Sequence, residues 1–203
     1  MSHRPCFLLA HGAGAPSSSP WMLAWRDRLA TLGAVEAFDY PYMRAGRKSP
    51  DKLPALIEAH RAALAALRAR ETGPTFLIGK SMGGRVGCHL ALEEDVAGVI
   101  CLGYPLRSGA GALRDEVLLA LRRPILFVQG TRDPLCPLDK LAEVRVKMEK
   151  ASTASNTLVV VEGGNHSLEV SGGRKAKAAL QADSDAKVLD AIARFTAAIA
   201  SQA

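Results

Sequence analysis

One short stretch of the sequence carries residue types that could bind phosphate or perform covalent chemistry. Residues 79–83 read GKSMG. A phosphate-binding loop with this lysine and serine requires a glycine at position 74, where the chain has Pro74. The alternative is a G-x-S-x-G elbow, in which a serine stands on a sharp turn between a buried strand and a helix. The apolar run at 75–78 favours the elbow, so Ser81 is the candidate nucleophile.

Ser81 needs two partners, because a serine hydroxyl is a weak nucleophile unless a base accepts its proton and a carboxylate orients that base. His166 and Asp133 could fill these roles, since each follows a strand-like run. Asp139 and Glu162 compete for the role of the carboxylate. However, Asp139 falls at or inside a helix-like run, and Glu162 precedes the histidine turn on its own strand. The pattern therefore predicts an acyl-transfer site built from Ser81, Asp133 and His166.

Such a site also needs two backbone N–H donors for the charge that develops on the carbonyl oxygen. We assign one donor to Met82, at the start of the helix after Ser81, where the helix dipole adds to it. The second is assigned to Ala13, in the glycine-rich loop HGAG that follows the first strand-like run. Polar or aromatic residues in loops after strands are candidates for the substrate pocket: His11, Tyr42, Arg44, Lys80 and Arg107.

Several of these residues keep alternative roles at the level of sequence. His11 either shapes its loop through hydrogen bonds or lies at the pocket rim. Lys80 either pairs with a carboxylate such as Asp39 or brings positive charge toward the site. Basic residues in loops after strands could form a rim that concentrates anionic substrates, unless they are solvated charges facing away from the pocket. They are Arg44, Arg47, Lys48, Arg107, Arg174, Lys175 and Lys177.

Strand-like and helix-like runs alternate along the chain, which predicts an α/β fold with a mainly parallel sheet between two layers of helices. Strands are expected near 4–10, 34–40, 75–80, 97–103, 124–130 and 157–162. Helices are expected near 20–32, 51–70, 82–94, 112–122, 137–150 and 184–200. Because the carboxyl ends of parallel strands lie at one edge of the sheet, the candidate residues should meet there.

Length and composition restrict the class of protein. A chain of 203 residues fits a single domain spanning 1–203. Apolar runs are much shorter than the roughly 20 residues that cross a bilayer, so we expect a cytoplasmic protein without membrane association. The net charge is +6, but aromatic residues make up only 5% and the basic residues are dispersed, which argues against nucleic acid as a partner. The four cysteines lack metal-binding spacing, and neither a metal nor an organic cofactor is implied.

The motifs together resemble the α/β-hydrolase superfamily over nearly the whole chain. The segments that carry the resemblance are HGAG, FDYPYMRAGRKSPD, GKSMGGR, GYPL, GTRD and GGNHSL. They are similar to segments of small lid-less predicted serine hydrolases, of dienelactone-hydrolase-like enzymes and, more distantly, of a hydrolase-like subunit of the animal non-specific-lethal acetyltransferase complex. The resemblance implies a triad of Ser81, Asp133 and His166. It also implies a three-layer α/β/α fold, from which this sequence departs in two ways. The chain begins at what would be the superfamily's third strand, so we expect a minimal sheet of six strands without the first two, and no segment is long enough for a lid.

Residues and resemblance together predict a serine hydrolase that cleaves a small carboxylic ester or thioester through an acyl-enzyme. Its partner would be a small acyl compound, neutral or anionic. The rival interpretation is a non-catalytic interaction scaffold on the same fold, because a fold alone does not prove activity. A homodimer also stays open, since Trp21 and Trp25 suit either a core or a contact surface.

Overall fold

A computed structural model describes residues 4–109, 111–171 and 173–201, apart from the side chains of Arg174 and Lys175. Six strands form one parallel sheet in the order β2-β1-β3-β4-β5-β6. They are β1 (Cys6–Ala10), β2 (Ala34–Phe38), β3 (Thr75–Lys80), β4 (Gly98–Leu102), β5 (Ile125–Gly130) and β6 (Asn156–Val161). The predicted fold class is confirmed. The sequence predicted a mainly parallel sheet, and every described strand is parallel to its neighbours.

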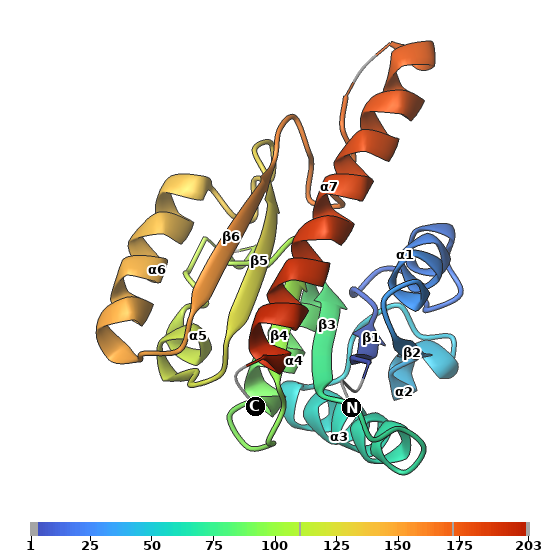
Figure 1. The fold of residues 1–203 in the computed structure, drawn as a ribbon, viewed down its shortest axis with the longest axis vertical. Helices are drawn as coiled ribbons and strands as arrows, with labels where there is room; N and C mark the ends of the chain where they lie inside the picture. The colour runs from blue at the N-terminus through green and yellow to red at the C-terminus, as the bar shows by residue number, and fades with distance from the viewer. Residues whose placement is uncertain (1–3, 110, 172, 202–203) are drawn as a thin grey trace.

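Helices cover both faces of this sheet (Figure 1). They are α1 (Pro20–Ala30), α2 (Pro41–Arg44), α3 (Leu53–Arg68), α4 (Met82–Leu90), α5 (Glu116–Ala120), α6 (Leu138–Ala151) and α7 (Arg174–Ala200). Helices α3 to α6 contribute to the core on one face, and α1 with α7 to the core on the other. The sheet is therefore the middle layer of three, as the sequence predicted.

Two helices differ from the prediction. The one-turn helix α2 was not expected, and α7 begins at Arg174 rather than near residue 184. The first half of α7 is rich in alanine and lysine, which favour a helix without forming an apolar stripe. Its first turns project beyond the sheet (Figure 1), so no packing face marks them in the sequence. No helix of the described residues is both long and apolar enough to cross a bilayer.

The two faces of the sheet are filled by alternate residues of each strand. In β1, Cys6 and Leu8 point into the core beneath α3 to α6, while Phe7 and Leu9 point into the core beneath α1 and α7. All five residues of β1 are buried. Such a continuous apolar run is typical of a parallel strand covered on both sides. This packing fixes the strand ends from which the candidate residues emerge.

Helix α3 places a histidine inside the core. Leu56, His60, Leu64 and Leu67 form its buried stripe. Nδ1 of His60 lies 3.2 Å from the hydroxyl oxygen of Tyr40. Burial lowers the pKa of His60 to about 3, so the imidazole is neutral in the folded protein at ordinary pH.

We expect acid to destabilise the fold through His60. In the unfolded chain a histidine binds a proton near pH 6.5, whereas the folded protein does not protonate His60 until about pH 3. Above pH ~6.5 His60 is neutral in both states, so its protonation does not affect the free energy of unfolding. Below that pH only the unfolded chain binds the proton, and the free energy of unfolding falls by about 1.4 kcal/mol per pH unit as the pH drops toward 3. Urea unfolding of wild type and His60→Gln at several pH values checks this. The variant should show the flatter pH dependence, and equal slopes would contradict the expectation.

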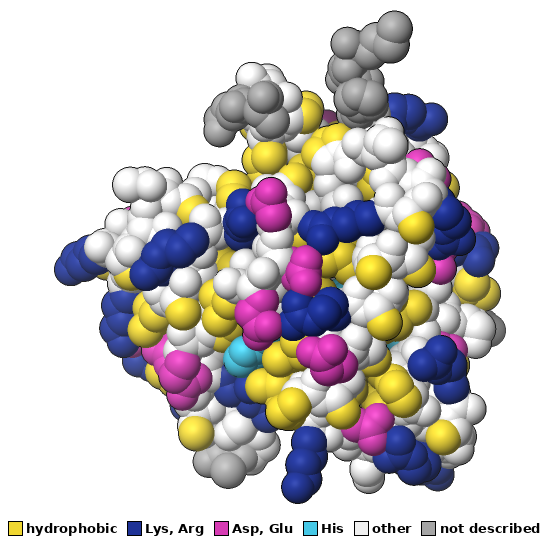
Figure 2. All heavy atoms as spheres, turned by 90° about the horizontal axis from the view of Figure 1, so that it is seen from below, with side chains coloured by type: hydrophobic (Ala, Val, Ile, Leu, Met, Phe, Trp, Pro, Cys, Tyr) yellow, Lys and Arg dark blue, Asp and Glu magenta, His cyan; other side chains and the backbone are white. Residues whose placement is uncertain are grey.

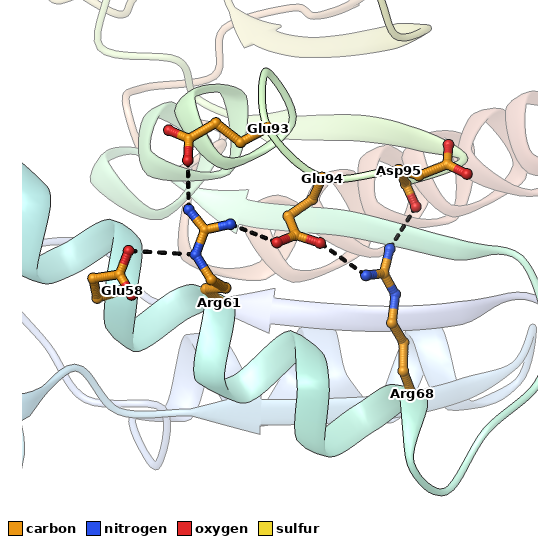
Figure 3. Close-up of polar contacts among 6 residues, drawn as sticks. All are labelled: Glu58, Arg61, Arg68, Glu93, Glu94 and Asp95. Carbon is orange, nitrogen blue, oxygen red and sulfur yellow. Dashed lines mark hydrogen bonds and ion pairs between the residues drawn. The ribbon is translucent and has the colours of Figure 1, made fainter.

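Charged side chains join α3 to the segment after α4 (Figure 3). Arg61 reaches Glu93 at 2.6 Å and also contacts Glu94, whose second oxygen lies 3.0 Å from Arg68. The full network comprises Glu58, Arg61, Arg68, Glu93, Glu94 and Asp95. Viewed from below, the molecule shows basic and acidic side chains interspersed rather than separated (Figure 2). The network links α3 to the chain just beyond the C-terminus of α4, the helix that begins after Ser81.

Candidate active site

Ser81 stands on the turn between β3 and α4. Its backbone φ is 49°, a region that residues other than glycine rarely adopt. The Ser81 N–H donates to the carbonyl of Leu102 at 3.0 Å, and the Ser81 carbonyl accepts the N–H of Arg85 at 3.1 Å. Gly83 allows α4 to approach β1, because a Cβ at this position would lie 2.5 Å from the carbonyl oxygen of Ala10. The turn thus holds the Ser81 hydroxyl at the carboxyl edge of the sheet.

The structure brings together the three residues that the sequence proposed as a triad. Nε2 of His166, in the loop after β6, lies 2.8 Å from Oγ of Ser81. Nδ1 of the same imidazole lies 2.7 Å from Oδ2 of Asp133, in the loop after β5. Asp139 and Glu162 are both exposed, and neither is hydrogen-bonded to His166 among the described contacts. The geometry therefore favours Asp133 over its two competitors.

The carboxylate of Asp133 is buried and accepts hydrogen bonds at both oxygens. Oδ1 accepts the N–H of Leu135 at 2.8 Å, and Oδ2 accepts from Nε2 of Gln129 as well as from His166. Oε1 of Gln129 in turn accepts the N–H of Tyr104 at 3.0 Å. Sequence reasoning missed Gln129. The signal that could have found it is a polar residue near the end of the otherwise apolar strand ILFVQG.

The loop that carries His166 is held by close backbone contacts. Gly103, directly after β4, has φ 69°, and a Cβ there would lie 2.5 Å from the carbonyl oxygen of His166. Within the loop, Oδ1 of Asn165 accepts the N–H groups of Ser167 at 2.8 Å and Glu169 at 3.0 Å. The backbone on either side of the imidazole is therefore positioned by the neighbouring strand and by its own side chains.

Two backbone segments beside Ser81 carry the N–H groups assigned to an oxyanion hole. Met82 is the first residue of α4, so its N–H has no acceptor within the helix. The loop at Gly12 passes close by, because a Cβ on Gly12 would lie 3.6 Å from Cβ of Ser81. The next residue, Ala13, is held by the Tyr42 hydroxyl, which donates to its carbonyl at 3.0 Å. Burial raises the pKa of Tyr42 to about 12, so the hydroxyl remains a donor.

A cavity of about 650 Å³ opens beside Ser81. The loop after β1, the start of α1 and the loop with His166 form most of its wall. Trp21, Met22 and Leu135 give this wall an apolar character, while Lys80 and Glu169 add opposite charges. Among the described residues, no group of three or more His, Cys, Asp or Glu side chains is arranged to hold a metal ion.

Of the five proposed pocket residues, only Lys80 lines this cavity. His11 is buried beneath its loop, with Nδ1 2.6 Å from the carbonyl oxygen of Gly12 and Nε2 accepting the N–H of Tyr40 at 3.1 Å. Both ring nitrogens are thus used in shaping the loop, and burial lowers the pKa of His11. Of the two interpretations of His11, the structure favours the loop-shaping one, because the side chain is fully buried directly after β1.

The other three candidates also lie away from the cavity. Tyr42 is buried beneath the loop after β1, where its hydroxyl donates to the carbonyl of Ala13 and its ring packs against that of His11. The chain turns into α2 directly after β2, and this turn carries Arg44 to a separate groove between β2 and α3. Arg107 is exposed, and its backbone N–H donates to the carbonyl of Leu135 at 2.7 Å. These three residues therefore do not line the cavity beside Ser81, because their positions depend on the direction in which each loop turns, which was not visible in the sequence.

The predicted basic rim does not surround the cavity. None of its described side chains is part of the cavity wall. Arg47, for example, pairs with Asp51 at 2.7 Å, and Lys177 is exposed on the first turns of α7. The side chains of Arg174 and Lys175 lie outside the described residues. The described basic side chains therefore fit the alternative interpretation, in which they are solvated charges that face away from the pocket.

Of the two roles considered for Lys80, the ion pair with Asp39 is not formed. That carboxylate instead accepts the N–H of Ser17 at 2.6 Å. The ammonium of Lys80 lies over the indole ring of Trp21, 5.3 Å from the ring centroid. Nε1 of Trp21 donates to the carbonyl of Ser167 at 2.8 Å, which fixes the ring against the loop that bears the histidine. The aromatic contact was missed because α1 and β3 are distant in the sequence.

A parallel sheet with a serine turn after β3 and with carboxylate and histidine loops after β5 and β6 defines an α/β-hydrolase fold. The sequence matches the family described as alpha/beta hydrolase domain over residues 3–197, and the chain belongs to that family. The resemblance read from the motifs is thereby confirmed. Membership supports a hydrolase activity without naming the substrate.

Solved structures share this fold at low sequence identity. A lid-less serine hydrolase from Xanthomonas campestris is 20% identical, with a TM-score of 0.67 over 89% of this chain and 81% of that one. An alpha-beta serine hydrolase homologue from Coxiella burnetii is 17% identical, with a TM-score of 0.66 over 89% and 88%. Dienelactone hydrolase from Anabaena variabilis is 17% identical, with a TM-score of 0.61 over 90% and 85%. At these identities the likeness shows the fold alone.

Proposed function

We propose that this protein is a serine hydrolase that cleaves a small carboxylic ester or thioester through an acyl-enzyme on Ser81. The observation that carries the proposal is the continuous hydrogen-bonded chain from Oγ of Ser81 through His166 to the buried Asp133, with distances of 2.8 and 2.7 Å. The positive φ of Ser81 adds support, because strained backbone is retained mainly at functional sites.

In acylation, Nδ1–H of His166 donates to Asp133, which leaves Nε2 free to accept the Ser81 proton as Oγ attacks the substrate carbonyl carbon. The N–H groups of Met82 and Ala13 are assigned to the oxygen that becomes negative. The imidazolium then transfers its Nε2 proton to the leaving group, which is protonated on oxygen in an ester and on sulfur in a thioester. The bond between the carbonyl carbon and the leaving group breaks, and the acyl group remains on Ser81.

In deacylation, a water molecule takes the place of the leaving group. Nε2 of His166 accepts a proton from this water as its oxygen attacks the acyl carbon. The tetrahedral intermediate collapses, the imidazolium returns the proton to Oγ of Ser81, and the carboxylic acid is released. Asp133 stays ionised throughout and keeps the imidazole oriented.

Labelling with a fluorophosphonate probe tests the proposal. Wild type should be labelled, because Oγ of an activated serine attacks phosphorus as it would attack a carbonyl carbon. Ser81→Ala should lose the label, whereas Ser152→Ala, at the end of α6, should be labelled like wild type. Peptide mapping should locate the adduct at Ser81. A folded wild type that stays unlabelled would contradict the proposal and favour the interaction scaffold.

A further inference from the structure

Lys80 is a cation in the cavity wall that the triad chemistry does not use. Its stem runs beside the loop after β1, since a Cβ on Gly12 would lie 3.7 Å from Cγ of Lys80. Its half-buried ammonium rests on the face of Trp21, 5.3 Å from the ring centroid. No described carboxylate forms an ion pair with it, although several other basic side chains of the protein are paired. An unpaired, partly desolvated cation therefore lies in the same cavity as Ser81.

The two carboxylates whose charges act on Lys80 have other hydrogen-bond partners. Burial lowers the pKa of Lys80, and the charges of Glu169 and Asp133 oppose this shift without forming an ion pair. Asp133 is committed to His166. Glu169 is exposed at the mouth, where one carboxylate oxygen lies 3.3 Å from Nδ2 of Asn165. Because an ammonium out of water is unfavourable without a partner, a ligand anion in the cavity would supply the missing counter-ion.

We propose that Lys80 binds a carboxylate of the substrate, so that the enzyme prefers esters or thioesters that carry a negative charge. This inference rests on the proposed function, because it places the substrate in the cavity where Ser81 attacks. The apolar wall formed by Met22 and Leu135 strengthens the ion pair, since charges are less screened there than at an open surface. Trp21, fixed by its hydrogen bond to Ser167, holds the ammonium in position.

Two matched pairs of esters test this preference. In the first pair the charge lies in the acyl part: the nitrophenyl monoester of adipic acid against the same ester with its free acid methylated. In the second the charge lies in the leaving group: acetylated hydroxybenzoic acid against its methyl ester. The quantity measured is the ratio of kcat/KM for the charged and neutral members of each pair, after subtraction of spontaneous hydrolysis.

Wild type should prefer the charged member of at least one pair, and the pair that responds tells on which side of the scissile bond the carboxylate lies. Lys80→Met keeps the length of the stem but removes the charge, so the ratio in that pair should fall by about 10- to 100-fold. Lys80→Arg should retain most of the ratio, because the guanidinium also binds carboxylates.

Two further variants control for general electrostatics. Lys150→Met removes an exposed lysine at the end of α6, at the opposite edge of the sheet, and should leave the ratio unchanged. Glu169→Gln removes a negative charge at the mouth and should raise the ratio, because it removes repulsion. A loss caused by net charge alone would appear in Lys150→Met as well and would overturn the inference.

The remaining outcomes are also decisive. A wild-type ratio near one in both pairs, or equal ratios in wild type and Lys80→Met, overturns the role of Lys80. Fluorophosphonate labelling of the same preparations separates this failure from a failure of the proposed function. Labelled protein with flat ratios rejects only the carboxylate subsite, whereas unlabelled wild type rejects the hydrolase and the subsite together.

Discussion

Replacing Ser81 or His166 with alanine is expected to lower kcat by about a millionfold, and replacing both should cost little more than either change alone. The hydroxyl and the imidazole form one unit, with Oγ and Nε2 2.8 Å apart, so either loss removes the activated nucleophile. A residual acceleration of about a thousandfold over water should remain, because the oxyanion donors and substrate binding are intact. Hydrolysis rates of a nitrophenyl ester by the two single variants and the double variant measure this.

His89→Ala is the matched control for the histidine change. His89 lies in the last turn of α4, away from the cavity, and its loss should change the rate by no more than a few-fold. Thermal unfolding should show that the Ser81 and His166 variants remain folded. If the effects of the two single changes multiplied in the double variant, the two residues would not act as one unit.

Replacing Asp133 with asparagine is expected to lower kcat by about ten-thousandfold while leaving the fold intact. Asparagine fits the same space, but its amide nitrogen can donate to Nδ1 of His166 and so stabilise the tautomer that carries the proton on Nε2. That tautomer cannot accept the proton of Ser81. The N–H of Leu135 donates to Oδ1 of Asp133, so an asparagine should keep its oxygen at that position and place its amide nitrogen at the Oδ2 position, which faces His166 and Gln129.

Asp139→Asn is the control for this change, because Asp139 was one of the two competing carboxylates in the sequence and is exposed in the first turn of α6. It should leave kcat within a few-fold of wild type. Steady-state kcat values of the two variants, each compared with wild type, measure these effects. Retention of more than about a tenth of wild-type activity by Asp133→Asn, together with a large loss in Asp139→Asn, would reassign the carboxylate.

The sequence was sufficient for the six strands, for the helices other than α2 and the start of α7, and for the placement of Ser81, Asp133 and His166 at one edge of the sheet. Buried parallel strands are continuous apolar runs, and their carboxyl ends share one edge, so chain order translates into position. The early start of α7 was not visible because alanine and lysine favour a helix without an apolar stripe.

The cavity wall was harder to predict, because it depends on the direction each loop takes after its strand. His11 points inward, and Arg44 is carried away by α2, although both follow strands as Ser81 does. Trp21 reaches the site from α1. This helix is far from Lys80 in the sequence, so no local sequence pattern indicates the contact. Gln129 is the exception, since a polar residue near the end of an apolar strand is a local signal.

The hydrogen bond from Trp21 to Ser167 makes the wall of the cavity and the base-bearing loop a single mechanical unit. A substrate too bulky for the cavity cannot push the indole outward without also pulling on the residue next to His166. Steric exclusion in this protein should therefore appear as slower turnover of oversized esters that still bind, rather than as weaker binding alone.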